Sequence, residues 1–383
     1  MNQDIIIIGG GASALMLASL LPKNSATIIE SNPKLGAKVL ISGGGKCNIT
    51  NRYMGCEYYV GKCAFVKPSL DLFSQKSLLH WLKQRKLIPV LRNEEHYFCK
   101  DSANEILDIF KKESKGQKFL LNEKVLEVSK RGEFFRVKTA KRTLNAKVVV
   151  LASGGLSFPK IGASSIGYEI AESFGHSVKK TAPGLVGFTV QKDQFFFKEL
   201  SGLSTDVEIR VGEDKCKGAL LFAHKGISGP AVLDASLFWE RGKIEINFLS
   251  GFLLKSLRSS KKQLSSLLPL PKRLTKAFLL QLGLDDKTGN TLTSEDLHTL
   301  ETLCRYSFAP AGTFGYSKAE VTKGGVSTDE IDAETMQSKN VEGLFFIGEV
   351  LDVTGRLGGY NFQWAFSSAY SCAKFLTRGK NEN

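Results

Sequence analysis

Residues 4–14 read DIIIIGGGASA, an apolar run that enters a turn of three glycines and continues into small residues. Gly9, Gly11 and Ala14 have the spacing G-x-G-x-x-A. This spacing is typical of the turn between the first strand and the first helix of a dinucleotide-binding βαβ unit. There the glycines permit a tight turn and a close approach of backbone to a ligand. The segment therefore predicts that a helix N-terminus faces a pyrophosphate.

The residues that follow agree with this unit. A helix-forming run covers 15–21, a second apolar strand covers 26–29, and an acid, Glu30, stands twenty-one residues after Gly9. In a dinucleotide-binding unit that acid accepts a hydrogen bond from a ribose. An ordinary βαβ turn is the alternative, but it gives no reason for Glu30.

A second glycine-rich segment near the other end of the chain predicts the opposite wall of the same site. The run 341–347 reads as a short buried strand, Gly348 and Glu349 stand at its end, and Gly358 and Gly359 open a helix. Ligands bind at the carboxyl ends of strands in open α/β sheets, so this acid is expected to reach the ribityl chain of a flavin. Because only one complete fingerprint is present, FAD fits better than NAD as the tightly bound cofactor, and a nicotinamide donor, NAD(P)H, is expected to bind transiently.

Composition sets further bounds. The chain has 383 residues, a formal net charge of +14, and no apolar run long enough to span a membrane. No signal peptide precedes the first strand, so we expect a soluble cytoplasmic protein with no membrane partner. The seven scattered cysteines show no C-x-x-C pair, and most are expected to be reduced thiols. The five histidines show no metal-ligand spacing, so no metal site is expected.

The coarse secondary structure reads as an α/β fold with insertions. Helical spacing covers 69–86, and a β-meander is expected over three alternating runs, 119–128, 133–139 and 143–151. The last run ends in Ala152, Ser153, Gly154 and Gly155, where backbone is expected to approach a ligand. Short alternating stretches between 188 and 248 predict a β-rich domain. Leucine-rich helical spacing over 251–307 predicts a helical insert.

Further segments resemble the YhiN/BaiN-type flavoprotein family, which includes aminoacetone oxidase-like proteins and ribosomal RNA dihydrouridine synthase. The resemblance covers nearly the whole chain. It is carried by SGGGKCNITN at 42–51, GGLSFP at 154–159, FAHKGISGP at 222–230, EVTKGGV at 320–326, GEVLD at 348–352 and GGYN at 358–361. Three positions depart from the family pattern: Lys46 replaces an arginine, Ala223 a threonine and Ile166 an aspartate. Lysine keeps the charge at position 46 but loses the planar fork of arginine.

The resemblance implies a Rossmann-like, glutathione-reductase-like FAD-binding domain that is split by the insertions. We assign residues 1–187 and 327–383 to this domain, 188–250 and 308–326 to the β-rich substrate domain, and 251–307 to the helical insert. Most of the residues expected to hold the cofactor lie in or beside the glycine-rich segments. They are Gly9, Gly11, Ala12, Ser13, Ala14, Glu30, Lys38, Gly43, Gly44, Gly45, Lys46, Cys47, Asn48, Val125, Ala152, Ser153, Gly154, Gly155, Gly348, Glu349, Gly358, Gly359, Tyr360 and Asn361.

Two residues are candidates for the catalytic acid. Reduction of a pyrimidine double bond needs a hydride at one carbon and a proton at the next, and Cys47 or His224 is expected to supply the proton. For Cys47 the alternative is a thiol packed into a tight turn, since only exposure and a lowered pKa would make it special. For His224 the alternative is a loop histidine that holds backbone together.

The positive net charge of the chain indicates an anionic binding partner. The insert carries Lys255, Arg258, Lys261, Lys262, Lys272, Arg273 and Lys276, with no acid between 251 and 284. Such a surface is expected to contact phosphates of ribosomal RNA. A second basic stretch, 111–147, also fits a solvated face. The oligomeric state is not indicated.

The leading hypothesis is an FAD-dependent oxidoreductase that reduces uridine to dihydrouridine in large-subunit ribosomal RNA. One alternative is an oxidase or dehydrogenase for a small amine or ketone. Another is a flavin-containing RNA-binding assembly factor without catalysis.

Overall fold

The computed structural model, which describes residues 2–378, divides into two compact units. The first combines the chain up to Pro183 with the chain from Val321 onward, and the second spans Gly184–Glu320. The sequence had assigned 321–326 to the β-rich domain. In the structure β19 (Val321–Val326) pairs with β11 (Val178–Gly184), so it belongs to the first unit.

A parallel sheet forms the centre of the first unit. Its strands are buried because βαβ crossovers cover both faces, which is why residues 5–8 and 148–151 are continuous apolar runs. The second half of β10 (Thr143–Leu151) pairs with β20 (Leu344–Phe346), whereas its first half pairs with β9 (Phe134–Thr139). The parallel strands lie in the order β7 (Lys118–Leu120), β2 (Ala26–Ile29), β1 (Asn2–Ile8), β10 (Thr143–Leu151) and β20 (Leu344–Phe346). The antiparallel strands that continue from β10 are β9 (Phe134–Thr139) and β8 (Val125–Arg131).

The expected strand over 119–128 is two strands, because Asn122 turns the chain with a φ of 51°. One of them, β7, joins β2 at the edge of the sheet, and the other, β8, begins the meander.

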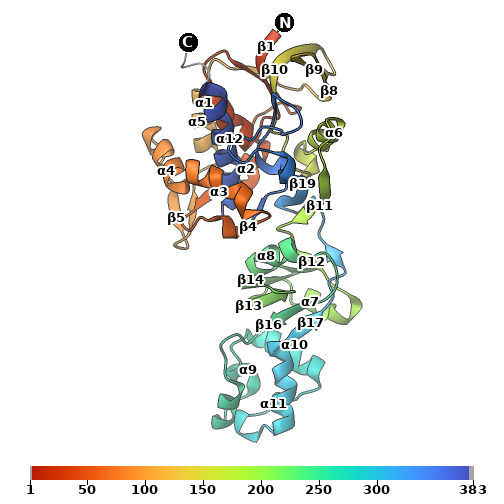
Figure 1. Cartoon of the computed structure of the whole chain (residues 1–383). Coiled ribbons are helices and arrows are strands. Elements are labelled where there is room, and N and C mark those ends of the chain that lie inside the picture. The colour runs from red at the N-terminus through yellow and green to blue at the C-terminus, as the bar shows by residue number, and fades with distance from the viewer. Residues whose placement is uncertain (1, 379–383) are drawn as a thin grey trace. The chain divides into compact units, whose positions relative to one another are not determined.

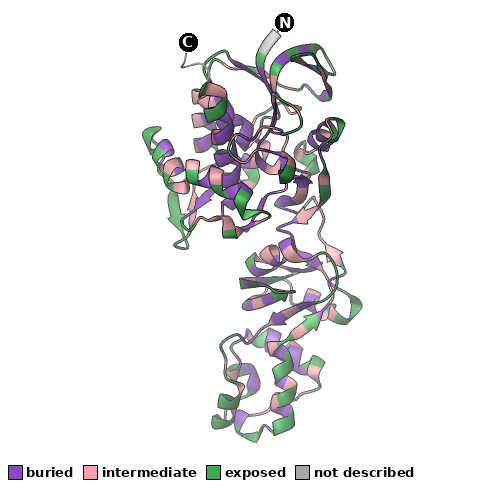
Figure 2. Ribbon diagram, in the orientation of Figure 1, coloured by how far each residue is buried: buried purple, intermediate pink, exposed green. Residues whose placement is uncertain are grey.

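The helices of the first unit pack around the sheet and one another. Helix α1 is apolar on all sides and buried, since it packs against α12 and α5 as well as the sheet (Figures 1 and 2). Helix α12 also packs against α3. The helices of this unit are α1 (Ala12–Leu20), α2 (Ala37–Ile41), α3 (Cys63–Leu72), α4 (Gln75–Gln84), α5 (Asn104–Glu113), α6 (Ile166–Ser173) and α12 (Tyr360–Arg378). No helix within residues 2–378 is long and apolar enough to cross a membrane.

The helical spacing over 69–86 belongs to two helices that break at Phe73. The ring of Phe73 stacks on Tyr370 with centroids 4.4 Å apart, and its carbonyl accepts hydrogen bonds from Gln363 and Ser367 on α12. Ser74 then caps α4 by accepting a hydrogen bond from the Ser77 amide. Contacts with α12, which sequence periodicity does not report, therefore end α3.

Small sheets complete the first unit. A three-stranded antiparallel sheet has the order β3 (Asn48–Asn51), β6 (His96–Phe98) and β5 (Val90–Arg92). A two-stranded sheet joins β4 (Tyr59–Val60) to β21 (Thr354–Gly355). Both sheets bring the early part of the chain against the segment that precedes α12.

The second unit is an antiparallel sheet with helices on the same core. Phe278 of α10 lies 4.8 Å from Phe248 and 5.7 Å from Tyr306, ring centre to ring centre, so the helical segment shares its core with the sheet. The strands have the order β17 (Tyr306–Phe308), β16 (Ile244–Asn247), β13 (Ser204–Val211), β14 (Asp214–Ala223), β15 (Gly226–Ser228), β12 (Phe188–Thr189) and β18 (Gly312–Thr313). The helices are α7 (Phe196–Glu199), α8 (Pro230–Phe238), α9 (Leu264–Leu267), α10 (Lys272–Leu282) and α11 (Ser294–Glu301).

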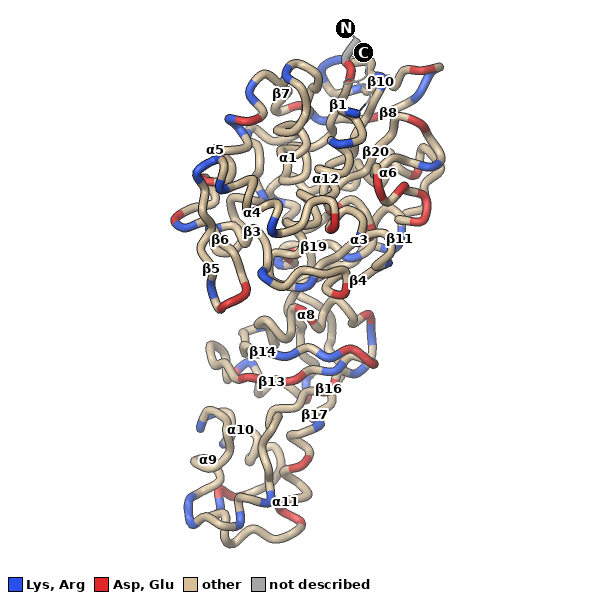
Figure 3. The backbone as a smooth tube through the Cα atoms, turned by 60° about the vertical axis from the view of Figure 1, so that its left-hand side comes forward, with Lys and Arg blue, Asp and Glu red and all other residues tan. Residues whose placement is uncertain are grey.

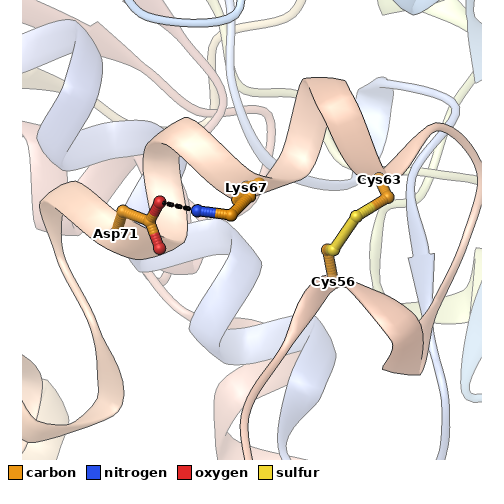
Figure 4. Close-up of a disulfide and its surroundings, with 4 residues drawn as sticks. All are labelled: Cys56, Cys63, Lys67 and Asp71. Atoms are coloured by element: carbon orange, nitrogen blue, oxygen red, sulfur yellow. Dashed lines mark hydrogen bonds and ion pairs between the residues drawn. A yellow bond between two sulfur atoms is a disulfide. The ribbon is translucent and has the colours of Figure 1, made fainter.

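One pair of cysteines forms a disulfide. Cys56 begins a single helical turn and Cys63 begins α3, and their Cα atoms lie 5.0 Å apart (Figure 4). The spacing of seven residues gave no sign of this bond, because the pairing depends on the path of the chain through β4. The other five cysteines are free thiols: Cys47, Cys99, Cys216, Cys304 and Cys372.

Candidate cofactor and active site

Three parallel strands end at one edge of the central sheet. The Ala152 amide donates to the Ile8 carbonyl at 2.9 Å, and the Ile347 amide donates to the Leu151 carbonyl at 3.0 Å. The segments that follow β1, β10 and β20 therefore lie side by side. These are the segments in which the sequence predicted the cofactor, and the carboxyl edge of such a sheet is where ligands bind.

The glycines of the first turn have different roles. Gly9 has a φ of 108°, and a Cβ added to it would lie 2.4 Å from the Ala152 carbonyl oxygen, so a side chain is excluded by packing. A Cβ added to Gly11 would meet nothing within 4 Å, and no side chain caps α1, which begins at Ala12. Gly154 opposite is equally open, with a φ of 71°. We call the open space in front of the amide groups that begin α1 the cradle. It fits the pyrophosphate that the sequence predicts at this turn, and that contact stays a prediction.

Glu30 lies at the end of β2 and is almost fully buried. One carboxylate oxygen accepts from the Gly10 amide at 2.6 Å, and the other accepts from the Asn32 amide at 2.7 Å. The Ser31 hydroxyl donates a third hydrogen bond at 3.1 Å. A carboxylate accepts about four hydrogen bonds, so one acceptor position is left for a ribose hydroxyl. Val125 begins β8 close by, since the amide of Glu123 donates to the Glu30 carbonyl.

Glu349 is held by a polar cluster of the protein itself. The Lys38 ammonium group lies 2.6 Å from one carboxylate oxygen, and the Thr322 amide donates to the other at 2.9 Å. Ser157 also accepts a hydrogen bond from Lys38 at 2.7 Å. Lys38 was predicted to contact the cofactor, but its charge is neutralised by Glu349. The predicted contact of Glu349 with a ribityl chain stays a prediction.

The triple-glycine turn adopts left-handed backbone throughout. Gly43, Gly44 and Gly45 have φ values of 54°, 66° and 84°. The turn is anchored by the segment after β6, because the Ala103 amide donates to the Gly45 carbonyl at 2.8 Å. The neighbouring Lys46 directs its ammonium group to the carbonyl of Lys100, at 3.4 Å.

Cys47 follows this turn with a φ of 46°, and its side chain is fully buried. Burial raises the pKa of the Cys47 thiol well above its usual value; the nearby Cys99 adds to the rise, and a hydrogen bond with Ser42 opposes it. The thiol is thus neither exposed nor acidified. Its role as the acid stays a prediction, and the geometry favours a packed thiol instead.

His224 is exposed in the turn between β14 and β15 of the second unit. Its catalytic role also stays a prediction.

The C-terminal glycines pack against β3 and β6. A Cβ added to Gly359 would lie 2.6 Å from the Thr50 backbone carbonyl carbon, and one added to Gly358 would lie 2.9 Å from Nε2 of His96. The Asn51 side chain donates to the Gly358 carbonyl at 3.0 Å. Only glycine fits this close approach.

The side chains of Tyr360 and Asn361 are engaged within the protein. Tyr360 stacks on Tyr58 with ring centres 4.8 Å apart, and Asn361 both donates to and accepts from the Gly355 backbone, at 2.9 and 2.8 Å. They hold the start of α12 in place.

Two buried polar atoms test whether FAD fits. The Ser153 hydroxyl, which follows β10, and the Asn48 side-chain oxygen, which follows the triple-glycine turn, lack a hydrogen-bond partner among the described residues. Buried polar atoms are normally paired. These two atoms and the open cradle at Gly11 lie in segments predicted to hold FAD, and a polar ligand bound there would give them hydrogen-bond partners. Among residues 2–378 no cluster of acidic, histidine and cysteine side chains could hold a metal ion.

The sequence reasoning missed His96. It is on β6, opposite Asn51, and its side chain is 24% exposed. Only the alternation of the short strand HYF could have indicated that its side chain shares a face with Phe98.

Comparisons with known proteins match nearly the whole chain. The family described as HI0933-like protein Rossmann domain matches residues 3–375. A ribosomal RNA dihydrouridine synthase of Escherichia coli is 39% identical over 396 residues, which covers 99% of each chain. A protein of the same name from Haemophilus influenzae is 38% identical over 396 residues, covering 98% of this chain and 99% of that one. A 3-dehydro-bile acid delta(4,6)-reductase of Clostridium scindens is 28% identical over 410 residues, covering 97% and 98%.

Solved structures support the fold. A quinol-fumarate reductase with menaquinol molecules aligns over 100% of this chain and 72% of that one, with a TM-score of 0.54 and 15% identity. The Escherichia coli quinol fumarate reductase aligns over 98% and 70%, with a TM-score of 0.52 and 13% identity.

Proposed function

Since the chain belongs to the HI0933-like family, a family of FAD-dependent oxidoreductases, we propose that it reduces uridine to dihydrouridine in large-subunit ribosomal RNA. The observation that carries the proposal is the full-length similarity to the two relatives named for that activity, at 38–39% identity. The more distant relative is named as a reductase of a 3-dehydro-bile acid. Both names describe the saturation of a C=C bond conjugated with a carbonyl group.

Different residues of this chain bind different parts of FAD. The amides at the start of α1 and the space in front of Gly11 bind the pyrophosphate. Glu30 binds the adenosine ribose, and Ser153 and Asn48 supply buried hydrogen-bonding atoms to the rest of the cofactor. When bound, FAD supplies hydride transfer, with a nicotinamide nucleotide as the donor that reloads it.

The basic segment from 251 to 284 is the proposed RNA-binding surface. All seven of its lysines and arginines are exposed. Figure 3 shows where lysines and arginines lie along the backbone. Arg258 and Arg273 each donate to a backbone carbonyl, which fixes the segment's shape. The remaining five make no ion pair with any described residue and are available to phosphates: Lys255, Lys261, Lys262, Lys272 and Lys276.

Nucleoside mass spectrometry tests the function. Purified protein loaded with FAD is mixed with a nicotinamide nucleotide and large-subunit RNA from a strain that lacks the gene, and dihydrouridine is counted. We expect one or a few uridines to be converted. If the donor reduces the flavin but the uridines stay unchanged, RNA is refuted as the substrate. That result would favour a small-molecule enone or ketone as the substrate. A flavin that stays oxidised with every donor while RNA binds would favour the non-catalytic assembly factor.

A charge-removal variant tests the RNA surface. Substituting the five free lysines of the basic segment with glutamine is expected to weaken RNA binding and to lower its salt dependence, by roughly 0.7–0.9 in the log–log slope for each lost phosphate contact. The control removes five exposed charges from β8–β10 instead. These are Arg131, Arg136, Lys138, Lys141 and Lys147. Equal loss in both variants would show that only net charge matters.

A further inference from the structure

One face of the β3–β6–β5 sheet collects side chains that suit a planar polar ring. Successive side chains on a strand point to opposite faces, so His96 and Phe98 share a face of β6. Their cross-strand partners on β5 are Arg92 and Val90, and on β3 Asn51 lies opposite His96. The Arg92 guanidinium lies 5.2 Å from the centre of the Phe98 ring. We call this set of side chains the β6 face.

The β6 face lies against two glycine segments whose residues are predicted to hold FAD. A Cβ on Gly43 of the triple-glycine turn would lie 2.8 Å from the Phe98 ring. A Cβ on Gly358 at the start of the C-terminal segment would lie 2.9 Å from Nε2 of His96. Both glycine segments therefore contact neighbouring residues of one strand. A ring bound on the β6 face would lie beside the flavin that those segments hold.

The chemistry of the face matches a pyrimidine ring. Phe98 offers an apolar surface for stacking, Arg92 offers paired donors for a carbonyl oxygen, and His96 offers a proton. The charged groups near His96 are Glu95, whose carboxylate oxygen lies 3.7 Å from Nε2, and Arg92 on the adjoining strand. Its side chain is 24% exposed, so a proton lost to a substrate is replaced from water.

We propose that the β6 face binds the uracil ring and that His96 is the catalytic residue that donates the proton, a role that rests on the proposed function. In the step the C5=C6 π bond breaks, a C–H bond forms at C6 with hydride from the reduced flavin, and a C–H bond forms at C5 with the proton from Nε2 of His96. The uracil is reduced, the flavin is oxidised, and His96 is left as neutral imidazole. A nicotinamide nucleotide restores the reduced flavin. In this proposal His96 has the role of proton donor that the sequence analysis assigns to Cys47 or His224.

Separate half-reactions test His96. Stopped-flow absorbance follows flavin reduction by the nicotinamide nucleotide and, in a second mix, flavin reoxidation by uridine-containing RNA. In His96→Gln we expect reduction at the wild-type rate, whereas reoxidation slows by roughly 10²–10⁴-fold and loses its pH dependence. His80→Gln, an exposed histidine that bonds Gln84 on α4, is the matched control and should behave as wild type.

A binding readout that needs no turnover tests the face itself. Uridine oligonucleotide added to oxidised holoprotein is expected to shift the flavin absorption band. Arg92→Gln should weaken that titration at least tenfold, and His96→Gln should leave it within a few-fold. His96→Asn serves as a second variant if His96→Gln loses FAD.

The outcomes separate the two proposals. Wild-type protein that neither binds nor reduces uridine RNA refutes the proposed function. If wild-type protein reduces uridine RNA and the flavin of His96→Gln is reoxidised at the wild-type rate, the role of His96 is refuted. Equal slowing of both half-reactions in His96→Gln and His96→Asn also refutes it, because that result indicates a structural role.

Discussion

Gly11→Ala should separate cofactor binding from folding. Gly11 has a φ of −82° and a ψ of −166°, which alanine adopts readily, and an added Cβ meets no atom within 4 Å. The free energy of unfolding should therefore change by no more than about 1 kcal/mol. The added methyl group, however, occupies the space in front of α1 where we propose that the pyrophosphate binds. Loss of one or two charge-assisted hydrogen bonds, at about 2 kcal/mol each, predicts a roughly 30- to 1000-fold weaker affinity for FAD.

Gly9→Ala provides the contrast within the same turn. Its Cβ would lie 2.4 Å from the Ala152 carbonyl oxygen, and the φ of 108° is unfavourable for alanine. Strain and overpacking together predict a loss of about 2–5 kcal/mol in the free energy of unfolding. In Gly9→Ala we therefore expect a loss of folding stability rather than a selective loss of FAD affinity.

The assay measures both quantities on the same preparations. Urea unfolding of the apoprotein gives stability, and quenching of flavin fluorescence on titration gives affinity. Gly11→Ala that binds FAD as tightly as wild type would refute the cradle. Gly11→Ala that unfolds as readily as Gly9→Ala would refute the distinction between an open glycine and a packed one.

Three further results are expected. Lys38→Met should destabilise the apoprotein by about 1–2 kcal/mol in urea unfolding, because it leaves the partly buried Glu349 carboxylate without its cation, and adding Glu349→Gln should restore part of the loss. Burial raises the pKa of the Cys372 thiol, so above pH 9 the unfolded chain loses a proton that the folded chain keeps. Because of this group the free energy of unfolding should fall by about 1.4 kcal/mol per pH unit. In Cys372→Ala the urea midpoint should therefore depend less on alkaline pH. Reduction of the Cys56–Cys63 disulfide, which closes a loop of sequence separation 7, should lower the free energy of unfolding by up to about 2.5 kcal/mol. A Cys56→Ser variant that unfolds at the same temperature as wild type would contradict this prediction.

The sequence predicted the parts of the site that depend on neighbouring residues in the chain. The strand, turn, helix and acid from 4 to 30 form a local unit, so their spacing alone identified the unit and its ligand class. The expected pairing of the two glycine-rich ends also followed from a general property of parallel sheets. The structure places both segments at the same edge.

The parts that the sequence did not predict depend on contacts between distant residues. The break at Phe73 comes from its packing on α12, and the position of His96 comes from its pairing with Asn51. For Cys47 the sequence shows a motif but not the direction of the side chain. The φ of 46° and the packing beside Cys99 turn that thiol into the core.

The split of the first unit has a consequence for biosynthesis. Strand β20 and helix α12 are made after the whole second unit, yet β20 pairs with β10 and α12 covers α1 (Figure 1). During translation the second unit has all of its strands before the first unit does. Until residues 344–378 leave the ribosome, one face of α1 is uncovered and the C-terminal wall of the cradle is missing. Nascent chains should therefore acquire FAD only at the end of synthesis, and their exposed apolar helix makes them clients for chaperones in the interval.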